Sequence, residues 1–283
     1  MSVIKKIVII LLSFSLSVLI ALTAVLSVTA ATIMNSKYAV KALEGSQFGE
    51  IELDRIREHF ISYGSAGNVE EAFFIKYFEK NISAKTVTDD MAKTVRALYA
   101  NEDISGEKYF FDALHLALNE YAEEMYMDVE DTDIAHGIKQ FTGDLIELYR
   151  RYVSIPYASS IAPQLKSLKS LLPIVTFALA FLSIACAAVI FFSFRKKAIP
   201  LSYIGASLGG AGLMLISFPL IVLITRQAEK FTLTDEAFRS FFIELINGFT
   251  GSLIVCGAVL LAAFIIICLG ILSRLKASPS PDK

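Results

Sequence analysis

Four long apolar stretches dominate the pattern of hydrophobic and polar positions along the chain. They comprise residues 7–34, 171–194, 198–225 and 248–273, and none of them contains Asp, Glu, Lys, Arg or His. Each exceeds the ~20 residues that an α-helix needs to cross ~30 Å of hydrocarbon at about 1.5 Å per residue. The pattern therefore predicts an all-α integral membrane protein with four transmembrane helices.

Residues 35–169, between the first and second stretches, have the composition of a soluble domain, and apolar residues recur there at steps of three and four. No segment alternates strictly at period two, so we expect no β-sheet. The recurring positions are Phe48, Ile51, Ile56, Phe60 and Tyr63, then Phe110, Phe111, Leu114, Leu118, Tyr121 and Met125, and then Ile134, Ile138, Phe141, Leu145, Leu148 and Tyr152. We predict a helical domain inserted between the first and second spans, with its core at Phe110, Leu114, Leu118, Phe141, Leu145 and Leu148, and with the ring of Phe141 fully buried.

Capping residues mark the expected helix boundaries. We expect the first transmembrane helix to continue through residues 36–44, and Pro156 and Pro163 to bend the approach to the second span. The expected N-caps are Asn68 with Glu71, Thr86 with Asp89, and Thr234, and the expected helix-ending glycines are Gly45 and Gly64. After Thr234, a stripe of Phe238, Phe241, Phe242, Leu245 and Ile246 predicts a short helical loop at 226–247 that packs on the membrane interface or on the neighbouring domain.

Basic residues flank the apolar stretches on one side of the predicted membrane, and this asymmetry sets the orientation. With four spans, that side carries eight basic residues and one acidic residue, whereas the rest of the chain carries 18 basic and 27 acidic residues. The domains expected are a cytoplasmic start with the first span at 1–34, an extracytoplasmic helical domain at 35–169, spans two to four at 170–273 and a cytoplasmic tail at 274–283. We expect a multi-pass protein of the cell membrane with both termini in the cytoplasm.

The first apolar stretch also resembles a signal peptide, because small residues at 28–30 follow a charged start. A signal h-region has about 7–15 residues, and this stretch is longer, so we expect it to remain as an anchor. Cys186, Cys256 and Cys268 all lie inside predicted spans. The outer domain has no thiol, and we therefore expect its own core to stabilise it.

Small residues are concentrated in the third predicted span. Gly205 and Gly209 form a G-x-x-x-G pair, which lets helix backbones approach closely in lipid. Gly210 and Gly212 extend the same region, and Pro219 predicts a kink. We expect these glycines to pack helices within the four-helix bundle rather than to form a homodimer.

Acidic residues cluster between the second and third stripes, at Asp128, Glu130, Asp131 and Asp133. Calcium prefers several oxygen ligands at about 2.3–2.6 Å, so this segment is a candidate cation site. The spacing departs from an EF-hand, because Lys139 occupies the place of the closing glutamate. We favour a solvated turn in which Asp131 or Thr132 caps the next helix, and we expect no metal or cofactor.

The other candidate groups are scattered. His59, His115 and His136 fall on separate predicted helices without the paired spacing of zinc ligands, so we expect ordinary surface positions. Residues 81–83 fit a glycosylation sequon, and we interpret this match as a chance occurrence. No predicted span contains an ionisable side chain, which argues against a proton-coupled transporter. Phosphate-binding and hydrolase motifs are absent from the sequence, and we expect no enzyme activity.

The first part of the chain resembles an uncharacterised family of bacterial four-span membrane proteins with a helical extracytoplasmic domain. The resemblance covers about the first 125 residues. It rests on the first span followed by residues 35–43, and on a stretch from Ile82 through Thr86 to Leu98 and Tyr99 ahead of a short turn. It implies a bacterial cell membrane and a helical outer domain, and it implies no functional residue.

Three functions remain as hypotheses. The placement of polar residues on one side favours a non-enzymatic envelope protein whose extracytoplasmic domain binds a protein, a peptide or an envelope component. A ligand sensor that signals through a separate partner is the first alternative, since the order of helices is similar to that of chemoreceptor domains. A channel or export component, with the third span lining an oligomeric pore, is the second. We expect the lipid bilayer as a partner and no nucleic acid, and homo-oligomerisation stays open.

Overall fold

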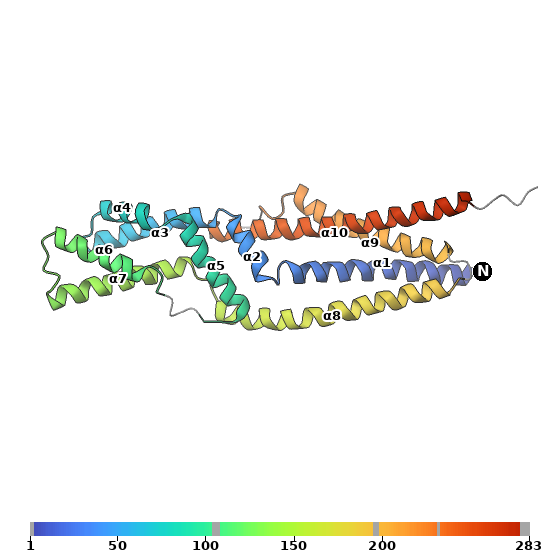
Figure 1. The fold of residues 1–283 in the computed structure, drawn as a ribbon, viewed down its shortest axis with the longest axis horizontal. Coiled ribbons are helices and arrows are strands. Elements are labelled where there is room, and N and C mark those ends of the chain that lie inside the picture. The colour runs from blue at the N-terminus through green and yellow to red at the C-terminus, as the bar shows by residue number, and fades with distance from the viewer. Residues whose placement is uncertain (1–2, 104–107, 195–197, 231–232, 278–283) are drawn as a thin grey trace, which may run out of the picture. The chain divides into compact units, whose positions relative to one another are not determined.

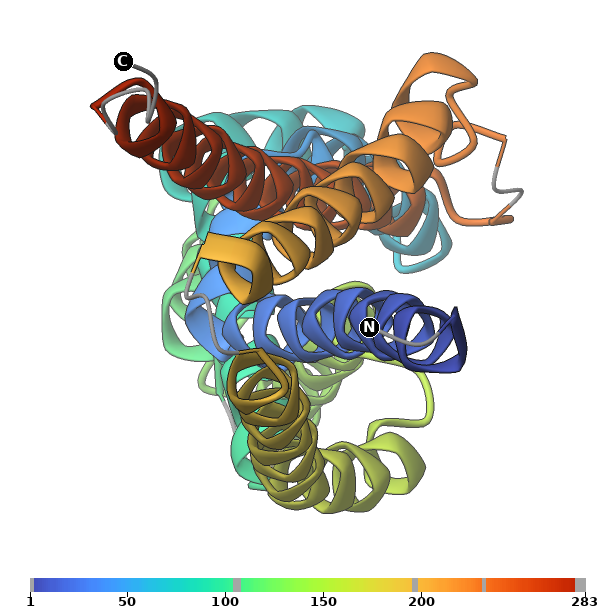
Figure 2. The same ribbon diagram turned by 90° about the vertical axis from the view of Figure 1, so that its right-hand side faces the viewer.

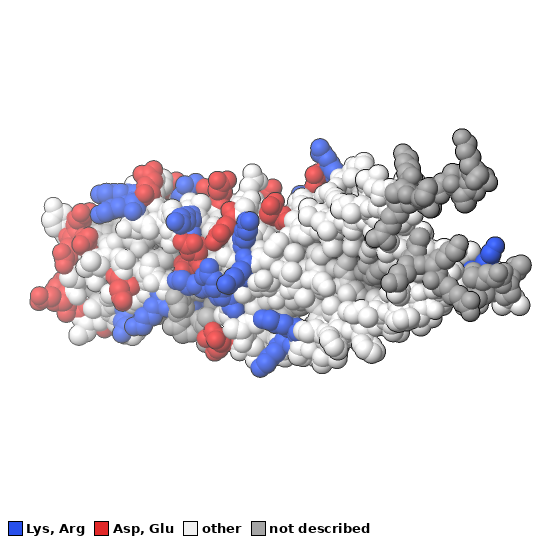
Figure 3. Space-filling model, turned by 45° about the vertical axis from the view of Figure 1, so that its right-hand side comes forward, with Lys and Arg blue, Asp and Glu red and all other residues white. Residues whose placement is uncertain are grey.

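The computed structural model describes residues 3–103, 108–194, 198–230 and 233–277, and every regular element in these ranges is a helix (Figure 1). The prediction of an all-α chain is confirmed. The chain forms two compact units. The apolar unit comprises Met1–Asn35, Ser167–Phe231 and Leu245–Lys283, and the polar unit comprises Ser36–Lys166 and Thr232–Glu244. On the face shown in Figure 3, the charged side chains gather on the polar unit.

Within the described residues, four helices are long and apolar enough to cross a membrane, as predicted. They are α1 (Val3–Ala31), α8 (Ala158–Phe192), α9 (Ala198–Ile224) and α10 (Glu236–Ala277). Helix α8 begins 13 residues before the apolar stretch does. Pro156 precedes the helix, whereas Pro163 lies in its second turn, where a missing N–H removes a single backbone hydrogen bond.

Helices α1 and α9 pack side by side in the apolar unit (Figures 1 and 2). The Ser13 hydroxyl lies 3.0 Å from the carbonyl oxygen of Tyr203, and the Ser207 hydroxyl lies 2.8 Å from the carbonyl oxygen of Ser13. A core of Ala21, Ala211, Leu215 and Leu253 adjoins them. Small and hydroxylated residues suit this contact, because helices in lipid associate through close packing and interhelical hydrogen bonds.

The first apolar helix does not continue through residues 36–44, contrary to the prediction. Helix α1 ends at Ala31, and a separate helix, α2, occupies Ser36–Glu44. Near the break, the hydroxyls of Thr29 and Thr32 donate to the carbonyl oxygens four residues before them, at 2.8 and 2.6 Å. Such back-bonding bends helices, and it accompanies the end of α1.

In its described residues, the polar unit is built from α2 and five further helices, together with the first turns of α8 and α10. These are α3 (Phe48–Ala66), α4 (Glu71–Asn81), α5 (Ala84–Ala100), α6 (Phe111–Glu124) and α7 (Thr132–Tyr152). Edge-to-face aromatic pairs hold α3 against α4, with Phe60 at 6.2 Å from Phe74 and 5.2 Å from Phe78 between ring centroids. The side chains that are fully buried in this unit include Phe48, Ile56, Phe60, Phe74, Met91, Leu114, Leu145 and Tyr149.

The prediction of the core was half correct. Leu114, Leu118 and Leu145 are buried, as expected. Phe141 and Leu148 are only partly buried, because α7 turns Thr142, Leu145, Ile146 and Tyr149 toward the core. Phe110, the N-cap of α6, is also partly buried. The hydroxyl of Tyr149 donates to the Asp90 carboxylate at 2.8 Å, and burial raises the pKa of Tyr149.

Several predicted helix boundaries were wrong. Gly64 does not end α3 but lies inside it, where a Cβ atom would approach Cε2 of Phe74 to 2.0 Å. Helix α4 has Glu70 at its N-cap, and Asn68 instead follows the end of α3 in the left-handed conformation, with φ at 57°. Helix α5 starts one turn earlier than predicted, because Ser83 is its N-cap and Thr86 completes the capping box. Gly45 follows the end of α2, as expected.

The segment before the fourth apolar helix is not a separate helical loop. Helix α10 is continuous, and its N-cap is Asp235 rather than Thr234, because one carboxylate oxygen of Asp235 accepts from the Phe238 backbone N–H at 3.0 Å. The other oxygen accepts from Arg55 of α3 at 3.0 Å. The ring of Phe238 packs edge-on against Phe48. The start of α10 is therefore attached to α3 by an ion pair and an aromatic contact.

Glu52 lies beside this ion pair and is 1% exposed. One of its carboxylate oxygens accepts from Arg55 at 3.0 Å, and the other has no hydrogen-bond partner. Burial and the nearby Asp235 carboxylate raise the pKa of Glu52 to about 7. The charged cluster of Glu52, Arg55 and Asp235 thus contains a carboxyl group that titrates near neutral pH.

Candidate ligand pocket

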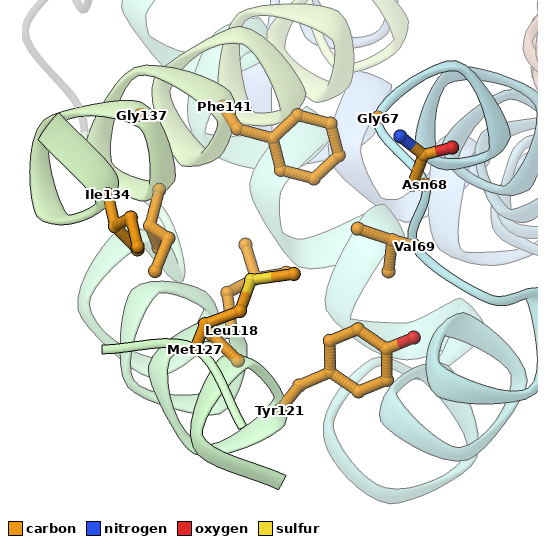
Figure 4. Close-up of a pocket in the computed structure, with 11 residues that line it drawn as sticks. Gly67, Asn68, Val69, Leu118, Tyr121, Met127, Ile134, Gly137 and Phe141 are labelled. Carbon is orange, nitrogen blue, oxygen red and sulfur yellow. The ribbon is translucent and has the colours of Figure 1, made fainter. Parts of the chain in front are cut away.

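An apolar pocket of about 320 Å³ opens in the polar unit between α6, α7 and the turn that joins α3 to α4. In Figure 4, Ile134 and Phe141 of α7 face Val69 of the turn, while Leu118 and Tyr121 of α6 and Met127 close a third side. The lining is formed by Gly67, Asn68, Val69, Leu118, Tyr121, Ala122, Met127, Ile134, Gly137, Ile138 and Phe141.

The same type of helix end, at the end of α3 and at the end of α6, positions residues on two walls of the pocket. At the end of α3, Asn68 adopts the left-handed conformation and the Val69 N–H donates to the Gly64 carbonyl at 2.9 Å. At the end of α6, Tyr126 adopts it, with φ at 60°, and the Met127 N–H donates to the Ala122 carbonyl at 3.0 Å. Both are Schellman motifs, which carry an apolar residue just beyond the left-handed position. Val69 and Met127 are those residues, and both line the pocket.

Ring contacts fix the aromatic walls. The Tyr121 hydroxyl accepts from the Glu70 backbone N–H at 3.2 Å, and its ring centroid lies 4.9 Å from that of Phe73. Phe141 stacks on Tyr63 at 5.5 Å, and the Tyr63 hydroxyl donates to Asp144 at 2.8 Å. Tyr121 and Phe141 are therefore held in place, although neither is fully buried.

Gly137 of α7 leaves space in the pocket. A glycine inside a helix destabilises it by roughly 0.5–1 kcal/mol relative to alanine, so packing usually explains its presence. Packing explains Gly64, which lies against Phe74, but an added Cβ at Gly137 would meet no atom within 4 Å. Gly143, six residues along the same helix, is equally unobstructed but borders a different hollow.

The predicted acidic residues lie on the chain between two lining residues of the pocket, Met127 and Ile134. Asp131 is the N-cap of α7 and accepts from the Asp133 N–H at 2.8 Å, and Asp128 accepts from the Glu130 N–H at 3.1 Å. Two of the carboxylates thus stabilise the local backbone. In the described part of the chain, no group of three or more His, Cys, Asp or Glu side chains is arranged to hold a metal ion.

The glycines of the third apolar helix contact two different neighbours within the apolar unit. Cβ atoms added at Gly205 and Gly209 would lie 3.1 Å from Ile267 and 3.0 Å from Phe264 of α10. Gly212 meets the backbone of α10 itself, where an added Cβ would lie 2.8 Å from the Gly257 carbonyl oxygen. Gly210 faces α1, 2.6 Å from the Ser17 hydroxyl by the same measure. Pro219 remains inside α9.

The three histidines are not brought together in the structure. His59 contacts the Tyr152 hydroxyl, His115 lies 3.3 Å from the Thr142 hydroxyl, and His136 is exposed on α7. None of them lines the apolar pocket.

Comparison with protein-family models, with curated proteins and with solved structures found no match. What the pocket can bind is therefore inferred from its lining residues alone. Its eleven lining residues include one hydroxyl group, on Tyr121, and one side-chain amide, on Asn68, and the remainder are apolar or glycine. Such a lining can hold an apolar group by removing it from water, and it offers no nucleophile beside a base.

The sequence did not indicate this pocket. Its walls come from three segments, 67–69, 118–127 and 134–141, and the hydrophobic stripes that contain Leu118, Ile138 and Phe141 are equally typical of a core. The sequence offered one signal, the glycines at positions 137 and 143 within a helical stripe, but it does not distinguish the pocket from the hollow beside Gly143.

Proposed function

We propose that this chain is a membrane-anchored binding protein of the cell envelope, and that its polar unit holds an apolar side chain of a protein or peptide partner in the apolar pocket. In this proposal the four apolar helices span the cell membrane, both termini lie in the cytoplasm, and the polar unit faces outward. The function is binding rather than catalysis.

The apolar pocket is the observation that carries the proposal. Ligand pockets have volumes of about 300–1,000 Å³ and are lined mainly by apolar and aromatic side chains with a few polar groups. At about 320 Å³, this pocket is at the lower end of that range, which suits one or two side chains better than a large cofactor. Gly137 is compatible with the same interpretation, because it lines the pocket and an added Cβ there would meet no atom within 4 Å.

The proposal is tested by photocrosslinking in cells. A benzophenone amino acid replaces Met127 at the pocket wall, in the otherwise native protein and in a Gly137→Leu background that fills the pocket. We expect a crosslinked protein or peptide adduct with the native background and loss of the adduct with Gly137→Leu. Gly143→Leu is the matched control, since it changes the same helix in the same way outside the pocket and should leave the adduct unchanged. Absence of an adduct, or an equal adduct with Gly137→Leu, contradicts the proposal.

A further inference from the structure

We infer that the occupant of the apolar pocket is a cationic peptide segment, with one apolar side chain inserted in the pocket and Lys or Arg residues beside it. This inference rests on the proposed function and adds the chemistry of the partner. Its basis is the acidic lip, defined as residues 123–133 together with Glu70 and Glu71, which flank the lining residues Met127 and Val69 along the chain.

The chain segments that form the pocket are acidic and lack cationic side chains. Ten of the eleven lining residues come from segments 60–75 and 109–138, which contain ten Asp or Glu residues and no Lys or Arg. The nearest lysines along the chain line other hollows. Lys76 and Lys80 border the hollow between α4 and α6, together with Glu70 and Glu124 of the lip, and Lys139 lies in a hollow on another side of α7. In Figure 3, acidic side chains predominate at the left-hand end of the polar unit. An apolar anchor flanked by positive charge complements this surface.

Two carboxylates of the acidic lip are placed against the preference of their own helix. Glu123 and Glu124 are the last residues of α6, where backbone carbonyl groups concentrate negative charge, and both are exposed. Helices favour Lys, Arg or His at this end, and none occurs in the last turn of α6. These glutamates therefore weaken the helix that carries them, which is expected where a surface serves binding rather than stability.

Tyr126 is also unfavourable for the local fold. It takes the left-handed position of the α6 Schellman motif, which favours glycine, and its side chain is 99% exposed. The tyrosine therefore introduces backbone strain and contributes no burial. It stands between Met125, which is 41% exposed, and Met127 of the pocket wall. Exposed aromatic and methionine side chains beside a pocket are typical of protein-binding surfaces.

A cationic segment fits these observations better than a lipid does. An anionic headgroup would be repelled by the acidic lip, and a neutral acyl chain would use the pocket without any need for the carboxylates. The expected partner therefore combines one apolar anchor with positive charge, and its binding should weaken as salt screens the charges.

The experiment titrates full-length protein in phosphatidylcholine nanodiscs with short synthetic peptides, and empty nanodiscs give the background. The first peptide carries one central fluorophenylalanine between two pairs of lysines. The second replaces the lysines with glutamates, and fluorine NMR reports the Kd of both. We expect the lysine peptide to bind at least about tenfold more tightly than the glutamate peptide, and to lose about tenfold in affinity for Gly137→Leu but not for Gly143→Leu.

Each contrary result has a separate meaning. Equal binding of the two peptides, abolished by Gly137→Leu, overturns the cationic partner and leaves the proposed pocket function intact. Equal binding of the lysine peptide to native protein and to Gly137→Leu overturns insertion in the pocket. If neither peptide binds while the Met127 crosslink in cells persists, the cationic partner is wrong and the proposed function stands.

Variants of the acidic lip distinguish binding from a structural role. Replacing both Glu123 and Glu124 with Gln should weaken the lysine peptide about threefold to tenfold while Tm stays equal or rises. Tyr126→Gly should also weaken binding and raise Tm. Tyr157→Gly is its matched control, because Tyr157 has φ at 59° and is 81% exposed but lies outside the pocket, so Tm should rise without a change in Kd. A lower Tm for the double glutamine variant, or unchanged binding by Tyr126→Gly, contradicts the inference.

Discussion

Phe141 and Phe74 are both phenylalanines of helical stripes in the polar unit, yet the structure gives them different energetic roles. Phe74 is fully buried, packed on Gly64 and Phe60, whereas Phe141 is partly exposed and forms a pocket wall. Phe74→Ala should therefore reduce the free energy of unfolding by about 3–5 kcal/mol, and Phe141→Ala by about 1–2 kcal/mol. Calorimetry of the full chain in detergent micelles shows which of the two variants loses more unfolding free energy.

His136→Ala serves as the surface control for this pair, and its effect should stay within about 0.5 kcal/mol, because the imidazole is exposed. A loss at Phe141 as large as that at Phe74 would show that the pocket closes over the ring in solution.

Gly64 and Gly137 are both helical glycines, and alanine should change stability in opposite directions at the two positions. At Gly64 the new methyl group would overlap the ring of Phe74, so Gly64→Ala should destabilise by about 1–3 kcal/mol through overpacking. At Gly137 the methyl group meets open space, so Gly137→Ala should stabilise by about 0.5–1 kcal/mol through helix propensity. Thermal unfolding followed by circular dichroism tests both, and destabilisation by Gly137→Ala would mean that the space beside it is filled.

At the scale of whole elements, the cluster of Glu52, Arg55 and Asp235 makes the attachment of α10 to α3 dependent on pH. The pKa of Glu52 is raised to about 7 in the folded chain, above the ordinary value of 4.5. Folding therefore favours the protonated carboxyl group. The contribution of this group to stability should be highest below pH 4.5, fall as pH rises from 4.5 to 7, and level off above pH 7. The total loss is on the order of 3 kcal/mol.

Glu52→Gln tests this dependence because glutamine keeps the shape and an oxygen that can accept from Arg55, but does not ionise. The variant should be more stable than the native chain at pH 8, with a smaller difference at pH 5. Hydrogen exchange of the first turn of α10 measures the effect locally. Equal pH profiles for the two proteins would show that the carboxyl group is not desolvated.

The existence of the helices could be predicted from the sequence, but several of their ends could not. The charge-free stretches identified the four apolar helices, and apolar spacing identified α3, α6 and α7. The predicted helix ends were wrong where a contact with a residue further along the chain determines the end. Gly64 resembles a helix terminator until Phe74, ten residues later, is known to pack against it. Asn68 resembles an N-cap until the Val69 N–H is seen to bond back to the Gly64 carbonyl.

The candidate site was less predictable than the helices for a related reason. The acidic turn was found, and the interpretation of Asp131 as a cap was confirmed, because capping is local. The apolar pocket depends on the rotation of α7, which turns Tyr149 and Ile146 inward and leaves Phe141 at the mouth. A rotation of this size is set by packing between helices, and a stripe of apolar residues does not define it.

At the scale of the whole molecule, the proposed function depends on how the chain is oriented in the membrane. A binding surface for an external partner requires the polar unit on the outer side. The same unit holds the net negative charge, and the short basic segments flank the apolar helices at their other ends. The second fact carries the orientation, because under the positive-inside rule basic residues of short segments stay in the cytoplasm, whereas the charge of a long domain has little influence.

The final prediction tests this orientation with single cysteines. Cys186, Cys256 and Cys268 are first replaced by alanine, since each lies partly buried in an apolar helix and would otherwise compete for the reagent. A cysteine in place of Glu130, beside Asp131 on the acidic lip, should react with a membrane-impermeant maleimide in intact cells. A cysteine at position 196 or 280, outside the described residues, should react only after permeabilisation. Glu130 is chosen because its side chain is exposed and, unlike Asp131, it is not the N-cap of α7, so folding should be preserved. Labelling of position 196 and not of position 130 in intact cells would place the pocket in the cytoplasm, and the partner would then have to be a cytoplasmic one.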